Sequence, residues 1–352
     1  MWRYIGTRLL IMLPTLFGAV TLTFAVTQFV PGGPLDQILL ELQQDGTPDG
    51  ESAGGGSTGY TSRLSIDPAQ VAELNRLYGF DQPVMLRYWE TLKRFARMDL
   101  GESYFQHESV WALIRSKLPV SISLGLWTLF ITYLVSVPLG VAKAVRAGSR
   151  FDFATSVLVL TGYAIPGFVL GIVLLVLFGG GTFWTIFPLR GLTSDNFAQL
   201  PLHAKVLDYL WHIVLPVTAS VVSQFAIKTM LTRNSFLDEI HKQYVLTARA
   251  KGLSERSVLW KHVFRNALIP LVTGLPAAFI AAFFTNSLLI ETLFSLDGLG
   301  LLSFESVKRR DYAVVLGALY LFTLIGLLAK LIGDVCYMLV DPRIKLQAGG
   351  AK

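Results

Sequence analysis

Residues 244–273 read YVLTARAKGLSERSVLWKHVFRNALIPLVT, a basic stretch on which the interpretation of the whole chain depends. It lies between two apolar stretches and therefore at a membrane surface. Small and straight-chain residues before Gly252 favour helix, Gly252 suits the left-handed position after a helix end, and Ser254 is a good N-cap. The segment predicts a helix, a glycine turn and a second helix.

The composition is that of a membrane protein. Of 352 residues, 53% are hydrophobic and 15% charged, and the mean hydropathy is +0.53, which is too apolar for an ordinary soluble protein. The net charge of +6 does not indicate nucleic-acid binding, because the basic residues gather at the ends of apolar stretches rather than along one aromatic-lined surface. The single cysteine, Cys336, excludes an internal disulfide.

Six apolar stretches are long enough to cross a hydrocarbon core of about 30 Å. The first follows Arg3 and Arg8 and lacks a small-residue cleavage site, so it predicts a retained helix rather than a cleaved signal peptide. The expected fold class is therefore an all-α membrane protein with six transmembrane helices. Their approximate ranges are Leu9–Val30, Leu118–Ala142, Phe153–Phe178, His212–Leu231, Ala267–Ile290 and Tyr312–Leu339.

The distribution of basic residues predicts the orientation. Fifteen Lys and Arg, Lys143 among them, lie in the tails and short loops on the side of the two termini, against five on the opposite side. The positive-inside rule then places both termini, the basic loop 232–266 and the tail 341–352 in the cytoplasm. The cluster Lys308–Arg310 lies on the opposite side and runs against the rule.

The segment 31–117, between the first two expected helices, predicts a small extracytoplasmic domain. It is acidic, with 12 Asp or Glu against 8 Lys or Arg, and it is long enough to be translocated regardless of charge. Its Gly- and Ser-rich part, 45–62, is typical of a mobile linker. A helix is expected to begin at Asp67-Pro68, with Val71 and Leu74 at helical spacing. The permease core is then 118–340, after an N-terminal tail and first helix over 1–30.

Several runs carry a family resemblance. They include TARAKGLS (247–254), RNALIP (265–270) and a GxDxP, aromatic and DLGxS pattern within 77–103. These runs resemble bacterial ABC importer permeases of the dipeptide, oligopeptide and nickel family. Leu246, Thr247 and Ala248 stand where the general permease pattern has Glu-Ala-Ala, and Pro270 falls later than usual, both as subfamily traits. Further runs are most similar to the Yej-type branch, which is associated with oligopeptides and microcin C: PGGPLDQ (31–37), GYAIPGF (162–168), FPLRGL (187–192), TRNSFLDE (232–239) and LVDPRI (339–344).

The resemblance implies a type I ABC importer permease fold and a cytoplasmic loop that docks on an ATPase. It implies a second homologous permease, two ATPase subunits or a fused ATPase, an extracytoplasmic peptide-binding protein and a peptide substrate as partners in a bacterial inner membrane. Arg249 and Lys251 are expected to meet acidic groups of the ATPase, and Ala248 and Ala250 to permit close approach. The coupling residues are then Thr247, Ala248, Arg249, Ala250, Lys251, Gly252 and Leu253. Without the resemblance, an amphipathic helix on lipid headgroups explains the loop equally well.

No energy-converting site is evident in the chain. There is no GxxxxGK[ST] to hold nucleotide phosphates, so ATP and Mg²⁺ are expected in the partner ATPase and no cofactor in this chain. The five histidines form no HExxH motif, and the middles of the expected spans lack the carboxylates typical of ion-coupled transporters. Lys228 is expected near a helix end, where its stem can snorkel.

Two further function classes stay open at this point. A passive channel would admit solute without an ATPase, and a membrane scaffold or receptor subunit would bind a loaded partner without moving substrate. Co-purification with an ATPase distinguishes the first from an importer, and uptake into vesicles distinguishes the second. Peptide length, peptide charge and the residues that touch substrate do not follow from the sequence.

Overall fold

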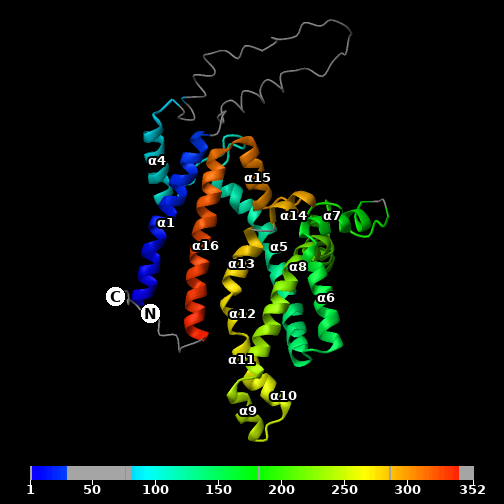
Figure 1. Ribbon diagram of the computed structural model, residues 1–352. Coiled ribbons are helices and arrows are strands. Elements are labelled where there is room, and N and C mark those ends of the chain that lie inside the picture. Colours follow the sequence, from blue (N-terminus) through cyan, green and yellow to red (C-terminus); the bar gives the residue numbers. More distant parts are fainter. Residues whose placement is uncertain (1, 30–75, 77–80, 181–182, 285–286, 341–352) are drawn as a thin grey trace. The chain divides into compact units, whose positions relative to one another are not determined.

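The computed structural model describes residues 2–29, 76, 81–180, 183–284 and 287–340 (Figure 1). Within these ranges the regular structure is helical, and the one β-bridge is an isolated pairing of Glu102 with Ser109. The all-α prediction is confirmed. The expected linker 45–62 and the helix expected from Asp67 lie outside the described residues.

The chain divides into two compact units. The first comprises residues 1–9, 117–302 and 325–352, and the second comprises 10–116 and 303–324. Long helices run through both. The helices are α1 (Trp2–Phe29), α4 (Val84–Ala96), α5 (Val110–Val145), α6 (Arg150–Ala164), α7 (Gly167–Phe178), η1 (Phe197–Gln199), α8 (Leu202–Ile240), α9 (Gln243–Ala250), α10 (Glu255–Ser257), the π-helix η2 (Val258–Val263), α11 (Phe264–Ala267), α12 (Ile269–Thr273), α13 (Leu275–Phe284), α14 (Ser287–Leu293), α15 (Leu299–Arg309) and α16 (Tyr312–Val340).

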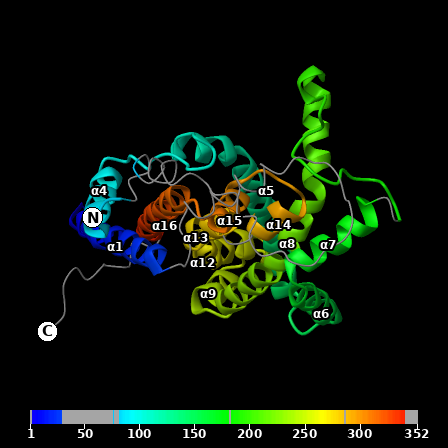
Figure 2. The same cartoon turned by 90° about the horizontal axis from the view of Figure 1, so that it is seen from above.

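Helix α8 is the centre of the first unit. It packs against α6, α7, α11, α12 and α14, as the view in Figure 2 shows for α6 and α7. At 39 residues it is about 58 Å long, and a hydrocarbon core of about 30 Å cannot contain it. Its last turns therefore carry the chain clear of the lipid interior. The core beside its first half is apolar and consists of Leu124, Ile213, Leu215, Val217, Ala219, Ile290, Phe294 and Leu296.

The expected third span is bent rather than straight. Helices α6 and α7 meet at an angle of 90° across Ile165 and Pro166. Proline has no N–H to donate and disfavours helical geometry in the residue before it, and Ile165 is extended, with φ −89° and ψ 118°. The run GYAIPGF thus marks a break within the expected span 153–178.

Four helices are long and apolar enough to span a membrane, and the bent α6–α7 pair can be counted as a fifth span, among the residues that the structure describes. The four are α1, α5, α8 and α16. The remaining expected span, 267–290, is divided between α12, α13 and α14. Several transmembrane helices are confirmed, whereas the count of six stays a prediction.

The second unit is held together by aromatic and polar contacts. The ring of Tyr88 of α4 packs at a tilt against Phe24 of α1, with 5.3 Å between ring centres, and the ring of Phe95 lies 5.1 Å from that of Tyr320 of α16. Asp311, directly before α16, accepts a hydrogen bond from the Ser103 hydroxyl. Burial raises the pKa of the Asp311 carboxyl above its ordinary value, and the Ser103 hydrogen bond opposes part of that rise. The part of the predicted outer segment around 84–110 is therefore folded.

Candidate functional site

The predicted helix, glycine turn and helix are present in the basic loop. Helix α9 ends at Ala250, and Gly252 follows with φ +80°. The Gly252 N–H donates to the Arg249 carbonyl at 2.9 Å, and the Leu253 N–H donates to the Ala248 carbonyl at 3.3 Å. This pair of bonds is a Schellman motif, which needs a left-handed residue where Gly252 stands. Open space surrounds the position that a Cβ of residue 252 would take.

One face of α9 is buried in a second apolar core of the first unit. Val245 is fully buried and Ala248 is 6% exposed. They pack with residues from the ends of α5 and α8 and from the second half of the loop: Val141, Ala144, Phe236, Val258, Val263 and Ala267. Ala248 therefore anchors the loop to its own subunit and faces inward, whereas Ala250 lies on the exposed side.

The second half of the loop begins with the predicted N-cap. The Ser254 hydroxyl accepts a hydrogen bond from the Ser257 N–H at 3.4 Å. The helix then widens into the π-helix η2 before α11. The ring of Trp260 on this wide turn packs at a tilt against Phe264, with 4.8 Å between ring centres, and Phe264 meets Phe236 of α8 edge-on at 5.7 Å. The aromatic contacts fix the returning chain against α8.

Charges on the two halves of the loop pair across the turn. The Arg249 guanidinium contacts the Glu255 carboxylate at 2.8 Å and donates a second bond at 3.1 Å. Close to the base of the loop, the Tyr244 hydroxyl donates to Glu239 at 2.6 Å. Burial, and next the Glu239 hydrogen bond, raise the pKa of Tyr244 above its ordinary value. Arg249 is thus engaged within the loop, while Lys251 is exposed.

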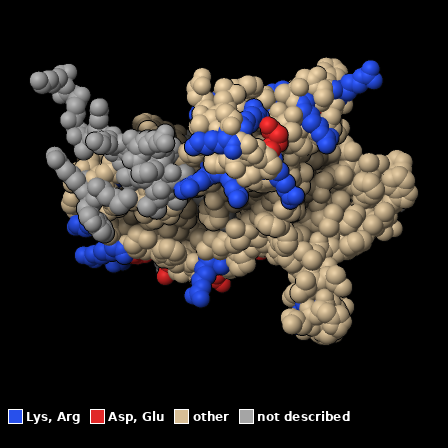
Figure 3. Space-filling model, turned by 90° about the horizontal axis from the view of Figure 1, so that it is seen from below, with Lys and Arg blue, Asp and Glu red and all other residues tan. Residues whose placement is uncertain are grey.

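The outer face of the turn is apolar at its centre and basic around it. Leu246 is 51% exposed and Leu253 is 40% exposed, and Thr247, Ala250 and Lys251 are exposed between them. We call these five residues the tip face. Viewed from the side of α9 and α10, the end of the molecule carries many Lys and Arg side chains and few acidic ones (Figure 3). Such a surface fits a partner that offers an apolar hollow with acidic edges.

Below the loop, a buried ion cluster joins three helices. Lys143 at the end of α5 is 0% exposed and lies 3.1 Å from Asp152 of α6. It also donates to the Asp152 carbonyl, the Thr155 hydroxyl and the Ser156 hydroxyl at 2.8, 2.9 and 2.7 Å. Arg233 of α8 binds the same carboxylate through two bonds of 2.8 and 2.6 Å. The cluster ties the last part of α8, which carries the loop, to α5 and α6.

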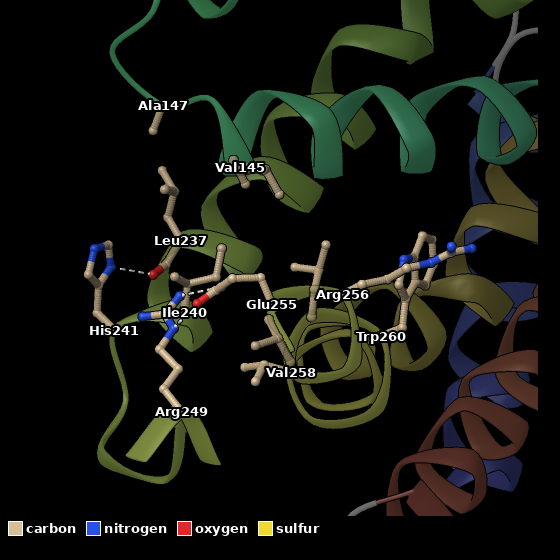
Figure 4. A pocket seen from close by; sticks show the side chains of 13 residues that line it. Val145, Ala147, Leu237, Ile240, His241, Arg249, Glu255, Arg256, Val258 and Trp260 are labelled. Carbon is tan, nitrogen blue, oxygen red and sulfur yellow. Dashed lines mark hydrogen bonds and ion pairs between the residues drawn. The ribbon is translucent and has the colours of Figure 1, made fainter. Parts of the chain in front are cut away.

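A pocket of about 480 Å³ opens beside the loop (Figure 4). The end of α5 and the turn after it contribute Val145 and Ala147, the end of α8 and the residue after it contribute Leu237 and His241, and the loop closes the rest. The Arg249–Glu255 pair lies at its edge, and the His241 ring contacts the Leu237 carbonyl at 2.7 Å. The walls are largely apolar and place no nucleophile beside a base. The arrangement is suited to contact with another surface rather than to catalysis.

Comparison with known proteins shows the family of this chain. Residues 136–346 match the family described as binding-protein-dependent transport system inner membrane component. The chain belongs to this permease family. The permease is 50% identical, over 99% of its length and the whole of the relative, to the inner membrane ABC transporter permease protein YejB of Escherichia coli O157:H7. It is also 50% identical, over 99% of both chains, to the peptidoglycan transport system permease protein YejB of Agrobacterium fabrum, and 30% identical, over 99% of its length and the whole of the relative, to the di/tripeptide permease DppB of Pseudomonas aeruginosa.

Sequence reasoning missed two features of the permease. It counted Lys143 among the loop cations of the positive-inside rule, whereas this side chain is fully buried. It also ended the fourth helix at Leu231 and so placed Lys228 near a helix end, whereas α8 continues to Ile240. Asp152, nine positions after Lys143, is the available signal for an ion pair, but nothing local indicates that Arg233 completes it.

Proposed function

We propose that this permease is one half of the translocation path of an ATP-driven peptide importer. It works with a second homologous permease, two ATPase subunits or a fused ATPase, and an extracytoplasmic peptide-binding protein. Its termini and the tip face lie in the cytoplasm, as the fifteen-to-five distribution of basic residues supports. The cargo is a peptide, because the relatives at 30% identity and full coverage are named as di/tripeptide, dipeptide and oligopeptide permeases. Oligopeptides, with microcin C-like peptides among them, are the expected subclass.

The observation that carries this proposal is the 50% identity to ABC transporter permeases over 99% of the chain. The geometry of the loop also indicates how a movement of the ATPase would be transmitted to the membrane-spanning helices. The buried face of α9 and the edge-on contact of Phe264 with Phe236 attach the turn to α8, the helix that is central to the first unit. A movement imposed on residues 247–253 is therefore passed to α8 rather than absorbed by a loose loop.

In the cycle that we propose, ATP binding closes the ATPase subunits and favours one orientation of the permease pair, and hydrolysis restores the other. This is alternating access, in which ATP shifts an equilibrium between two states by binding them unequally. This chain supplies no nucleotide site. Its part is to hold the tip face rigidly and to change the accessibility of the path when that face moves.

The test is co-purification of the permease with the ATPase subunits encoded beside it, comparing the wild type with Leu246→Glu. The substitution places a carboxylate at the apolar centre of the tip face and should reduce recovered ATPase and peptide-stimulated ATP hydrolysis at least tenfold. The control is Leu202→Glu, because Leu202 is also an exposed leucine (80%) but lies at the start of α8, outside the loop that carries the tip face. Full recovery of ATPase with Leu246→Glu would contradict the docking role, and no recovery with the wild type would favour the channel or scaffold interpretation.

A further inference from the structure

A positively charged side chain lies within the membrane-spanning part of the first unit without a carboxylate partner. The Lys228 ammonium of α8 lies over the ring of Tyr133 of α5, 5.6 Å from its centre. Across the residues that the structure describes, no salt bridge or hydrogen bond engages this ammonium. Three acidic residues of the same unit pair with other cations: Asp152 with Lys143 and Arg233, Glu239 with Lys242, and Asp334 with Arg8.

The contact partner of this ammonium is fixed between two helices. Tyr133 stands three positions from residue 130, the centre of the expected span 118–142, which corresponds to about 5 Å along a helix. The Tyr133 hydroxyl donates to the Leu271 carbonyl of α12 at 3.4 Å, so the ring is held between two helices. Lys228 itself stands three positions before the end of the expected span 212–231, and its ammonium lies against this ring of α5. An ionisable group inside a membrane protein generally faces the path and serves its substrate.

A second hydrogen-bond donor supports the same interpretation. Gln224 precedes Lys228 by four residues and so lies on the same face of α8. Its amide nitrogen Nε2 is buried without a hydrogen-bond partner in the described part of the chain. An ammonium has three donors and no acceptor, and a carboxylate has acceptors only. The two side chains together therefore offer hydrogen bonds that a carboxylate would complete.

We propose that Lys228 and Gln224 form an anion subsite in the translocation path, which binds the terminal carboxylate of a peptide in transit. The inference rests on the proposed function, because a peptide importer presents such a carboxylate with nearly every substrate molecule. Binding by Lys228 is charge-assisted, which makes it about twice as strong as a neutral hydrogen bond. The aromatic face of Tyr133 holds the ammonium in place between substrates. The subsite thus favours peptides with a free C-terminus.

The experiment compares two forms of one peptide, with a free C-terminal carboxylate and with a C-terminal amide. Uptake into proteoliposomes is measured for the complete importer with saturating, peptide-loaded binding protein. Each permease variant is scored by its ratio of carboxylate uptake to amide uptake, so that any preference of the binding protein cancels between variants. Lys228→Gln should lower this ratio about tenfold, which corresponds to about 1.4 kcal/mol, while amide uptake stays within twofold of the wild type.

Two further variants make the result specific. Lys228→Arg keeps the positive charge and should retain most of the ratio. Lys205→Gln is the matched control, because Lys205 is also on α8 and lies 5.6 Å from the centre of the Phe197 ring. It should leave the ratio unchanged.

The contradicting results are distinct. A ratio that Lys228→Gln leaves unchanged would overturn the subsite and favour a lipid headgroup as the counter-charge. An equal loss of both peptides would overturn it too, because Lys228 would then pair with an acid of the second permease or support the fold. Wild-type importer that takes up neither peptide would contradict the proposed function itself, independently of the subsite.

Discussion

Replacing Gly252 isolates the contribution of the turn between α9 and α10. The residue has φ +80°, and no atom outside its neighbours lies within 4 Å of the position that a Cβ would occupy. A Cβ at 252 therefore meets no steric clash. The free-energy cost of a substitution is then the strain of left-handed backbone in an L-residue. Relieving that strain would break the two Schellman hydrogen bonds.

The size of the effect follows from this geometry. Left-handed backbone costs a non-glycine residue about 1–2 kcal/mol, and about 1.4 kcal/mol is a tenfold change in an equilibrium. Gly252→Ala should therefore lower the population of the native turn about tenfold relative to its alternatives. Gly252→Asn should cost less, because asparagine tolerates this conformation, and Gly252→Val should cost more, because a β-branched residue resists positive φ.

The assay is peptide-stimulated ATP hydrolysis by the complete complex in lipid nanodiscs. The expected order is Gly, Asn, Ala and then Val at position 252, with membrane insertion unchanged. The same series at Gly148 is the control, because Gly148 also has positive φ (+75°) and open space at its Cβ but lies in the turn between α5 and α6. Equal activity of the Gly and Val forms at 252, or an equal loss at 148, would refute the idea that the shape of this turn transmits force.

Three other predictions concern stability, measured as the midpoint of thermal unfolding in detergent. Lys143→Met leaves the buried Asp152 carboxylate with one cation fewer and should lower the free energy of unfolding by about 3–5 kcal/mol, which a strongly lowered midpoint would show. A midpoint equal to that of the wild type would contradict the buried pair. Gly140→Val should also lower the midpoint, because even a Cβ at 140 would lie 2.5 Å from the Thr232 Cβ and overpacking typically costs about 1–3 kcal/mol; an unchanged value would rule out that close approach of α5 and α8. Burial raises the pKa of Asp311, so its stabilising contribution is present at low pH and is lost as the pH rises above about 4. Asp311→Asn should therefore flatten the fall of the unfolding midpoint with pH in this range. An unchanged slope would show that another group causes the pH dependence of the midpoint.

Local sequence patterns predicted the turn well because the interactions that form it are between residues close together in the chain. The left-handed residue at Gly252 and the N-cap at Ser254 depend on a few neighbouring residues and on backbone geometry, and the structure has both. The apolar character of α1, α5, α8 and α16 could likewise be read from composition. The orientation of Ala248 could not, because it depends on packing against the ends of α5 and α8, and α5 lies about a hundred residues earlier in the chain.

Long-range partners explain the other differences. The bend before Pro166 was concealed by an apolar run that continues on both sides of it, so hydropathy alone predicted one straight span. Lys143 and Lys228 both looked like cations at helix ends. The Lys143 cluster is completed by Arg233 on α8, which binds the same Asp152 carboxylate, and the Lys228 ammonium lies over Tyr133 on α5; no local spacing signals the part played by Arg233 or by Tyr133.

The most direct test of the coupling role is the accessibility of the tip face in the assembled importer. In a Cys336→Ser background, Ala250→Cys is reacted with a membrane-impermeant maleimide in inside-out vesicles, with and without the ATPase bound. Ala248→Cys is the buried control, since Ala248 is 6% exposed. The account predicts that the thiol at 250 reacts in the free permease and is protected by the ATPase, while the thiol at 248 stays unreactive in both. Equal labelling at 250 with and without bound ATPase would show that the turn is not the docking surface.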